Sequence, residues 1–185
     1  MIPPKCGTHS GLLFDLVNPD YSHVNVEDIA FGLSRQMRFN GHTKFPYSVA
    51  QHSMFVAELM PAELAAYGLV HDAHEAYMGD ITSPVKSAMA ELGGYEAITK
   101  LDDILSAATH AHFGLQWPLS KEIEEQVVKA DKLAAQFEKA HLLNMDFEQP
   151  FVLPRRLHKY MTPCSEELVR IQFAMLLKEI EKGAT

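Results

Sequence analysis

Cysteine is scarce in this chain of 185 residues, in which Cys6 and Cys164 are the only two. They are too few for a disulfide framework and too far apart for a paired-cysteine metal motif. Long apolar runs are also missing, because no stretch approaches the roughly 20 residues that a membrane-spanning helix needs. The first residues lack the basic and apolar regions of a secretory signal. We therefore expect a soluble protein of the reducing cytoplasm with no membrane partner.

Basic runs longer than two residues are absent as well. The chain has 24 acidic against 16 basic residues, and its formal net charge is −8 at pH 7. Because binding to the phosphate backbone needs a basic surface, we do not expect duplex nucleic acid as a partner. A local basic pocket for one small anion is compatible with this charge balance.

Strand patterns are nearly absent, apart from one short apolar run at residues 12–14 in an otherwise irregular N-terminal extension over residues 1–23. The hydrophobic fraction of 47% is that of an ordinary globular protein. No internal repeat, low-complexity segment or linker divides the chain. The sequence therefore predicts one all-α domain over residues 1–185, built as a compact helical bundle.

Caps and helical periodicity locate the expected helices. Asn25 is predicted to cap the first helix, and Ser48 forms a capping-box pattern with Gln51 at the start of the second. Periodicity places further helices over residues 61–78, 95–112, 120–143 and about 163–181, and the first over residues 25–36. Between them, residues 80–86 are expected as a loop and residues 146–163 as a surface excursion. In the last helix the side chains expected to face inward are Leu168, Ile171, Met175 and Leu176.

Ionisable residues interrupt one of these apolar faces. The expected helix over residues 61–78 carries Leu64, Gly68, His71, Glu75 and Met78 at alternating steps of three and four residues, which is the period of one face. An unpaired charge on a core-facing stripe is costly, so such groups are paired, hydrogen-bonded or bound to a metal. Asp72 follows His71 directly and can point to the edge of the same face. His71 and Asp72 are therefore candidates for binding one metal ion.

Two other expected helices offer similar groups. His52 lies on an apolar face of the second helix, and Asp131 lies beside the apolar stripe of the helix over residues 120–143. Taken alone, His52 is more often a core histidine bonded to a carbonyl, and Asp131 is more often a solvated acid. Taken together with His71 and Asp72, they favour a metal site.

Two imidazoles and two carboxylates suit one divalent ion, such as Mn²⁺, Co²⁺, Zn²⁺ or Mg²⁺, and do not choose among these. Such an ion activates water and polarises a phosphoryl oxygen. Glu75, one turn after His71, is placed to accept a proton from that water, and Asp80 to assist or to protonate the leaving oxygen. The alternative for Glu75 is an ordinary hydrogen-bonding partner that fixes a ligand histidine.

Further residues are candidates for binding an anionic substrate. Lys86 follows a stiff proline-containing loop and can reach back to a phosphate. Arg38 offers a bidentate anion contact, and Phe39 offers a flat surface for a base or sugar. Each of these is, taken separately, more often a surface charge or a core aromatic residue.

These residues resemble the HD-domain phosphohydrolase superfamily, named for an adjacent histidine and aspartate, here His71-Asp72. The resemblance covers about residues 25–180 and is closest to the branch of bacterial 5′-deoxynucleotidases and phage HD hydrolases, including phage dATP triphosphohydrolases. It rests on ordered motifs: Ser48-Val49-Ala50-Gln51-His52-Ser53, His71-Asp72-Ala73-His74-Glu75, Gly79-Asp80, Pro84-Val85-Lys86 and Ala130-Asp131. It implies an HD-type helical bundle in which His52, His71, Asp72 and Asp131 bind the metal and Glu75 and Asp80 are catalytic. By the same resemblance, Arg38 and Phe39 contact substrate, and the cytoplasm is that of a bacterium or of a phage host.

The implied function is hydrolysis of deoxynucleoside 5′-monophosphates to deoxynucleoside and phosphate. The alternative within the same chemistry is a deoxynucleoside triphosphohydrolase that releases triphosphate, for which additional pocket cations such as Lys44 or Lys129 would argue. A hydrolase for another phosphoester stays open, as do a non-catalytic module that binds metal and nucleotide and a helical interaction protein that binds no metal. Apolar faces of the last helices, and the relatives implied by the resemblance, lead us to expect a homo-oligomer, either a dimer or larger.

Overall fold

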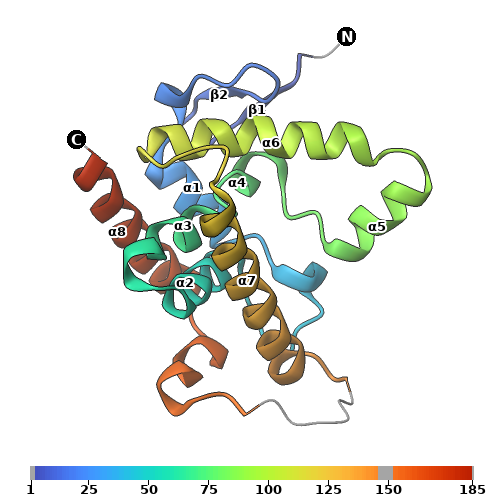
Figure 1. The fold of residues 1–185 in the computed structure, drawn as a ribbon, viewed down its shortest axis with the longest axis vertical. Helices are drawn as coiled ribbons and strands as arrows, with labels where there is room; N and C mark the ends of the chain where they lie inside the picture. Colours follow the sequence, from blue (N-terminus) through green and yellow to red (C-terminus); the bar gives the residue numbers. More distant parts are fainter. Residues whose placement is uncertain (1–2, 146–151, 185) are drawn as a thin grey trace.

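The computed structural model describes residues 3–145 and 152–184 and confirms the all-α prediction (Figure 1). Its helices are α1 Val26–Leu33, α2 Val49–Leu59, α3 Ala65–Val70, α4 Glu75–Met78, α5 Ser83–Glu91, α6 Tyr95–His112, α7 Lys121–Leu142 and α8 Glu166–Ala184. Short 3₁₀ segments lie at η1 Tyr21–His23, η2 Arg38–Gly41, η3 Ala62–Leu64 and η4 Arg155–Met161. Within the described residues, no helix has the length and apolar character required to cross a membrane.

Helix α2 lies at the centre of the packing. Every residue from Val49 to Val56 is buried. One side of α2 joins the apolar core that contains α1 and α8, and the other side joins a second core with α7 and η4. A polar side chain on this helix is therefore held in the interior of the protein, away from bulk water.

Both predicted N-caps are confirmed. The Asn25 side chain accepts hydrogen bonds from the backbone of Glu27 and Asp28 at the start of α1. The Ser48 side chain accepts from Gln51, and the Gln51 side chain accepts from the Ser48 backbone, which completes the capping box of α2. These caps satisfy amide groups that have no partner within the helix.

The predicted single helix over residues 61–78 is wrong, because this segment is broken into η3, α3, a turn at residues 71–74 and α4. In the turn, Ala73 donates to the Val70 carbonyl and Glu75 to that of Asp72, so the chain winds more tightly than an α-helix. Gly79, with a φ of +88°, ends α4 as expected. The apolar period continues through the break, which is why the sequence does not reveal it.

The N-terminal extension is more ordered than predicted. Strands β1 Lys5–Gly7 and β2 Leu13–Asp15 pair as an antiparallel hairpin, with Cys6 opposite Phe14. The Phe14 ring is buried and stacks on that of Tyr77, with ring centroids 3.9 Å apart. The hairpin is thereby tied to α4, and the short strand expected at residues 12–14 is shifted by one residue.

Two expected loops contain helix. Residues 83–91 form α5, with Pro84 in its first turn, where proline is favoured because no backbone donor is lost. The expected surface excursion at residues 146–163 contains η4, and Leu153 and Leu157 are buried against α2 and α7. Residues 146–151 of that excursion lie outside the described part of the chain.

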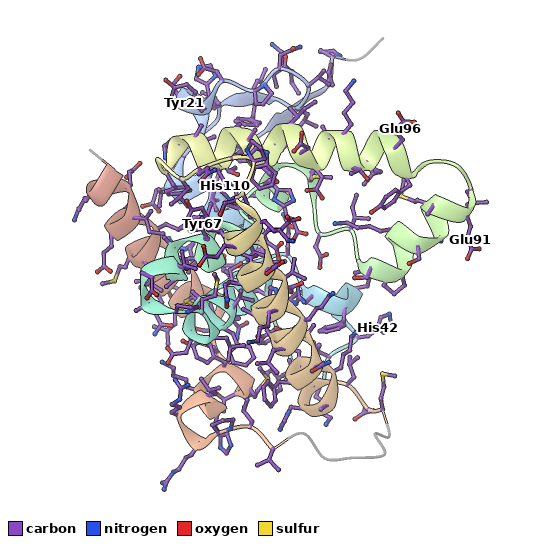
Figure 2. The ribbon with its side chains drawn as sticks, in the orientation of Figure 1. Tyr21, His42, Tyr67, Glu91, Glu96 and His110 are labelled. Carbon is purple, nitrogen blue, oxygen red and sulfur yellow. The ribbon has the colours of Figure 1, made fainter. Side chains whose placement is uncertain are left out.

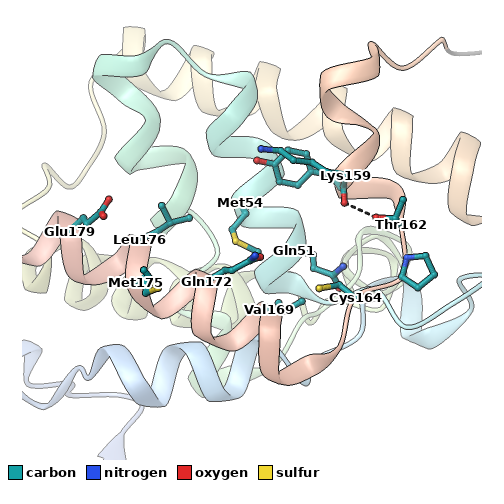
Figure 3. Close-up of a pocket in the computed structure, with 12 residues that line it drawn as sticks. Gln51, Met54, Lys159, Thr162, Cys164, Val169, Gln172, Met175, Leu176 and Glu179 are labelled. Atoms are coloured by element: carbon teal, nitrogen blue, oxygen red, sulfur yellow. Dashed lines mark hydrogen bonds between the residues drawn. The ribbon is translucent and has the colours of Figure 1, made fainter.

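The inward face of α8 consists of other residues than predicted. Leu168, Ile171, Met175 and Leu176 are 47%, 42%, 60% and 40% exposed, whereas Val169, Phe173, Ala174 and Leu177 are buried. Both sets are apolar and spaced at helical intervals, so periodicity alone did not separate them. Two of the exposed residues, Met175 and Leu176, help to line a groove of about 450 Å³ between α2, η4 and α8, together with Met54 and Cys164 (Figure 3).

This register gives a matched pair of substitutions. Leu177→Ala is expected to lower the free energy of unfolding by at least about 2 kcal/mol, because a fully buried leucine leaves a cavity. Leu176→Ala, one residue earlier on the exposed face, is expected to change it by less than about 0.5 kcal/mol. Urea denaturation of both variants measures the difference, and equal losses would contradict the register.

Candidate metal centre

His52 occupies the most buried part of α2 and is fully enclosed. Its Nδ1 lies 2.7 Å from Oε1 of Glu138, a carboxylate of α7 that is itself buried. Since an ionised carboxylate only accepts, Nδ1 carries the hydrogen. The Nε2 atom on the other side of the ring is buried and has no hydrogen-bond partner among the described residues.

His71 approaches His52 because α3 packs unusually close to α2. Gly68 makes this possible, since a Cβ there would lie 2.6 Å from the sulfur of Met60 and 3.0 Å from the Cα of Ala57. The His71 Nδ1 donates to the Gly68 carbonyl at 2.8 Å, which leaves Nε2 as the free ring nitrogen. The two imidazole centroids are 5.3 Å apart, and the Nε2 of His71 is also buried without a hydrogen-bond partner.

Together with Asp72, these two histidines form a group that could hold a metal ion. One ligand atom from each of His52, His71 and Asp72 lies within 4.8 Å of the others. The Asp72 Oδ2 is 3.1 Å from the His71 Nε2 and 3.6 Å from the His52 Nε2. Two ring nitrogens that face a carboxylate without hydrogen bonds leave a place for a positive charge between them, and a nitrogen and oxygen donor set of this kind fits a divalent ion.

The electrostatics of the group favour the same conclusion. Burial and the charge of Arg38 oppose protonation of His52, but the carboxylates of Glu138 and Asp131 outweigh them and raise the pKa to about 9. Burial likewise opposes ionisation of Asp72, but His71, His52 and Arg38 hold its pKa well below the usual range. The centre is thus a buried place where cationic charge is stabilised.

Asp131 of α7 lies at the edge of this group. Its Oδ1 is 3.1 Å from the His52 Nε2, and its side chain is 42% exposed. It is not one of the three residues whose ligand atoms all lie within 4.8 Å of one another. The structure therefore brings Asp131 next to the predicted ligand His52, on the open side of the centre.

Above the centre lies a pocket of about 220 Å³. All the predicted site residues except the more deeply buried His52 and His71 line it: Arg38, Phe39, Asp72, Glu75, Asp80, Lys86 and Asp131. Residues predicted for metal binding, proton transfer and anion binding thus meet at one cavity, although they come from three stretches of the chain, at residues 38–39, 72–86 and 131.

Glu75 and Asp80 stand on the two sides of the Gly79 turn in the pocket wall. Burial raises the pKa of both carboxyls, and the charge of Asp72 acts in the same direction. The Oε2 of Glu75 is buried without a hydrogen-bond partner among the described residues. Gln36 fixes this segment, because its amide donates to the Glu75 carbonyl at 2.9 Å and its oxygen accepts from the Asp80 backbone at 3.1 Å. Gln36 was not among the predicted site residues.

The Arg38 and Phe39 pair enters the pocket from η2. Phe39 has a φ of +54°, a left-handed conformation that is rare for a bulky side chain. The Arg38 Nε donates to Glu138 Oε2 at 3.0 Å, and its guanidinium carbon lies 5.5 Å from the centroid of the Phe39 ring. Arg38 is thus held in place by a buried carboxylate on one side while it lines the pocket on the other.

Glu138 is the main residue that sequence reasoning missed. It accepts hydrogen bonds from His52, from Arg38 and, at 3.0 Å, from the hydroxyl of Tyr47. Burial raises its pKa, but His52 and Arg38 outweigh that effect and lower it. The signal in the sequence was its spacing, because it follows Asp131 by seven residues and so lies on the same face of α7 two turns later.

The remaining expectations about charged residues have mixed outcomes. Lys139, which was not predicted, lines the pocket, whereas Lys44 donates to the His141 carbonyl at 3.0 Å and Lys129 is not part of the lining. His110, for which no site role was predicted, is buried, and its Nδ1 donates to the Ser106 carbonyl. His74 is also buried, and its ring contacts the carboxylate of Asp102 in α6.

The fold and the centre define an all-α protein with a histidine and aspartate group that could bind a metal ion. No family model matches the chain. An uncharacterized protein of Rhodobacter capsulatus is 39% identical over 138 residues, which cover 70% of this chain and 68% of the relative, and the chain belongs to the family of that protein. The uncharacterized protein YfdR of Escherichia coli is 33% identical over 111 residues, or 60% of this chain and 58% of YfdR.

Proposed function

We propose that this protein is a metal-dependent phosphohydrolase of the HD-domain superfamily that converts deoxynucleoside 5′-monophosphates to deoxynucleoside and phosphate. One observation carries the proposal. Two buried histidine nitrogens without hydrogen bonds converge with Asp72 beneath a pocket that holds further carboxylates and cations. Carboxylates that can move protons, and cations that can bind a phosphate, are the groups that metal-assisted phosphoester hydrolysis needs.

The residues that would hold the ion are His52, His71 and Asp72, with Asp131 on the open side. A divalent ion there would supply activation of water and polarisation of a phosphoryl oxygen. The Nδ1 bonds to Glu138 and to the Gly68 carbonyl keep both Nε2 atoms turned toward the ion position. The protein thus prepares the donor atoms before any ion arrives.

The pocket residues divide the remaining work. Glu75, whose raised pKa a bound cation would lower, accepts the proton of the attacking water as the water oxygen bonds to phosphorus. Asp80, whose pKa burial raises, gives a proton to the 5′ oxygen as the phosphorus–oxygen bond breaks. Arg38 and Lys86 bind the non-bridging oxygens of the phosphate. Phe39 offers its ring to the sugar or base at the mouth of the pocket.

The size of the pocket favours the monophosphate over the triphosphate. At about 220 Å³ it is smaller than the roughly 300–1,000 Å³ of ordinary ligand pockets. One observation favours the triphosphohydrolase alternative, because Lys139 adds a third cation to the lining. The two additional negative charges of a triphosphate would then have one additional cation, Lys139, as a partner.

Product analysis distinguishes these reactions. Protein loaded with Mn²⁺, Co²⁺, Zn²⁺ or Mg²⁺ is incubated separately with the four dNMPs, the four dNTPs and their ribose counterparts, beside a His71→Ala variant. We expect inorganic phosphate and deoxynucleoside from monophosphates, and no product from the variant. Intact triphosphate from a dNTP would establish the alternative, and metal binding without any product would leave a non-catalytic binding module.

A further inference from the structure

Helix α5 stands out from the bundle beside the first half of α6 (Figure 1). None of its residues is buried, so apolar packing does not fix its position over the pocket. Glu91 and Glu96, on either side of the turn that joins α5 to α6, lie at the far edge of the molecule (Figure 2). A contact other than apolar packing must therefore hold Lys86, the charged residue of α5 that lines the pocket.

That contact is an ion pair with α6. Lys86 is the residue of α5 that combines a positive charge with a place in the pocket lining. Its Nζ donates to Oδ2 of Asp102 at 3.3 Å. Burial lowers the pKa of Lys86, but the Asp102 carboxylate outweighs it and raises the value, so the charge of the ammonium is stabilised by this pair.

The same carboxylate reaches the turn that carries the metal group. Oδ1 of Asp102 lies 3.2 Å from Nε2 of His74, which is 5% exposed. The other ring nitrogen of His74, Nδ1, is buried without a hydrogen-bond partner among the described residues. Asp102 itself does not line the pocket. One side chain thus joins α5, α6 and the turn at residues 71–74.

We propose that Asp102 is a positioning residue that fixes the Lys86 ammonium at the pocket and the His74 ring behind it, and thereby sets the affinity for the phosphate group of the substrate. This inference rests on the proposed function for the identity of the substrate. It does not require Asp102 to touch the substrate, because its two oxygens are directed to Lys86 and His74.

The chemistry of lysine supports this division of roles. An ammonium group has three hydrogens to donate, so Lys86 keeps its bond to Asp102 while others point toward a phosphoryl oxygen. A long, flexible side chain that is already held in place loses less conformational freedom when the anion binds. Without Asp102 the same charge is present, but it is spread over many side-chain conformations.

Steady-state kinetics of Asp102→Asn, Lys86→Ala and the double variant test the proposal. Each single variant is expected to raise KM for the preferred nucleotide about 10-fold with kcat changed less than about 3-fold, as for a lost binding contact. The double variant is expected to match Lys86→Ala, since Asp102 acts through Lys86. Asp103→Asn is the control, because Asp103 accepts from the Trp117 indole at 3.0 Å and leaves the pocket untouched.

Binding of inorganic phosphate to the Mn²⁺-loaded proteins, measured by calorimetry, gives a readout that needs no turnover. We expect the same roughly 10-fold loss and the same non-additivity as for KM. Independent losses that add in the double variant, or an Asp102→Asn protein that binds phosphate like wild type, would overturn the role of Asp102. If phosphate binding shows the expected pattern while no nucleotide is hydrolysed, the proposed function fails and the positioning role stands.

Discussion

Replacing Glu75 with glutamine is expected to lower kcat about 10²- to 10⁴-fold, because the amide no longer accepts a proton from the attacking water. Metal binding is expected to stay within about 3-fold of wild type, since Glu75 is not one of the three grouped donors. The measurement is kcat with the preferred nucleotide, together with titration of the ion.

Glu91→Gln is the matched control, because Glu91 is exposed at the end of α5 and does not line the pocket. It is expected to leave both kcat and metal binding unchanged. A Glu75→Gln protein with at least half the wild-type kcat would remove Glu75 from the reaction. A variant that loses the ion instead would make Glu75 a residue that holds the metal group together, which was the alternative reading of its sequence position.

Replacing Glu138 with glutamine is expected to weaken binding of the ion about 10- to 100-fold, because the partner that orients a ligand histidine loses its charge. Stability without metal is expected to fall by about 3–5 kcal/mol, since the largely buried Arg38 loses its closest counter-charge. Both effects follow from one carboxylate that bonds His52 and Arg38 at once. Calorimetric titration with Mn²⁺ and urea denaturation in a chelator measure them separately.

Tyr47→Phe is the control for this second substitution. It removes one hydrogen bond to Glu138 and leaves the carboxylate in place, so the expected loss of stability is about 1 kcal/mol. Its affinity for Mn²⁺ is expected to match wild type. If Glu138→Gln binds the ion as tightly as Tyr47→Phe does, the bond between Glu138 and His52 does not prepare the metal centre.

Much of the centre was predictable because its residues are ionisable side chains at positions where the helical pattern expects apolar ones. Ionisable groups at His52, His71 and Asp72 stand on faces that are otherwise apolar, and burial of such groups calls for a partner. The structure places these residues together as the spacing suggested. Glu138 follows the same logic one step further along α7, since its seven-residue offset from Asp131 already put it on the face that meets His52.

Other features were not readable from periodicity. The break at residues 71–74 leaves the apolar period intact, so the chain looks like one helix from Pro61 to Met78 although it is not. In α8, two sets of apolar residues are each spaced at helical intervals, and tertiary packing buries the set that includes Leu177. The exposed apolar residues of α8 do not show whether the protein forms a homo-oligomer, so that expectation stays a prediction.

Long-range contacts were also beyond the sequence. Gln36 clamps a segment that lies about forty residues away, through bonds to Glu75 and Asp80. Lys86 and Asp102 sit on helices whose relative placement depends on the turn between them. Amino-acid type and spacing identify which residues carry chemistry, whereas the partners that position them emerge only once distant segments are packed together.

Metal content is the most direct test of the site. Wild-type protein and a His71→Ala variant are dialysed to equilibrium against Mn²⁺, and the bound ion is measured, with His141→Ala as the control histidine at the end of α7. We expect one ion per chain in wild type and in the control, and affinity at least about 100-fold weaker in His71→Ala. Absence of a bound ion in wild type, or unchanged binding in His71→Ala, would contradict a metal centre at His52, His71 and Asp72.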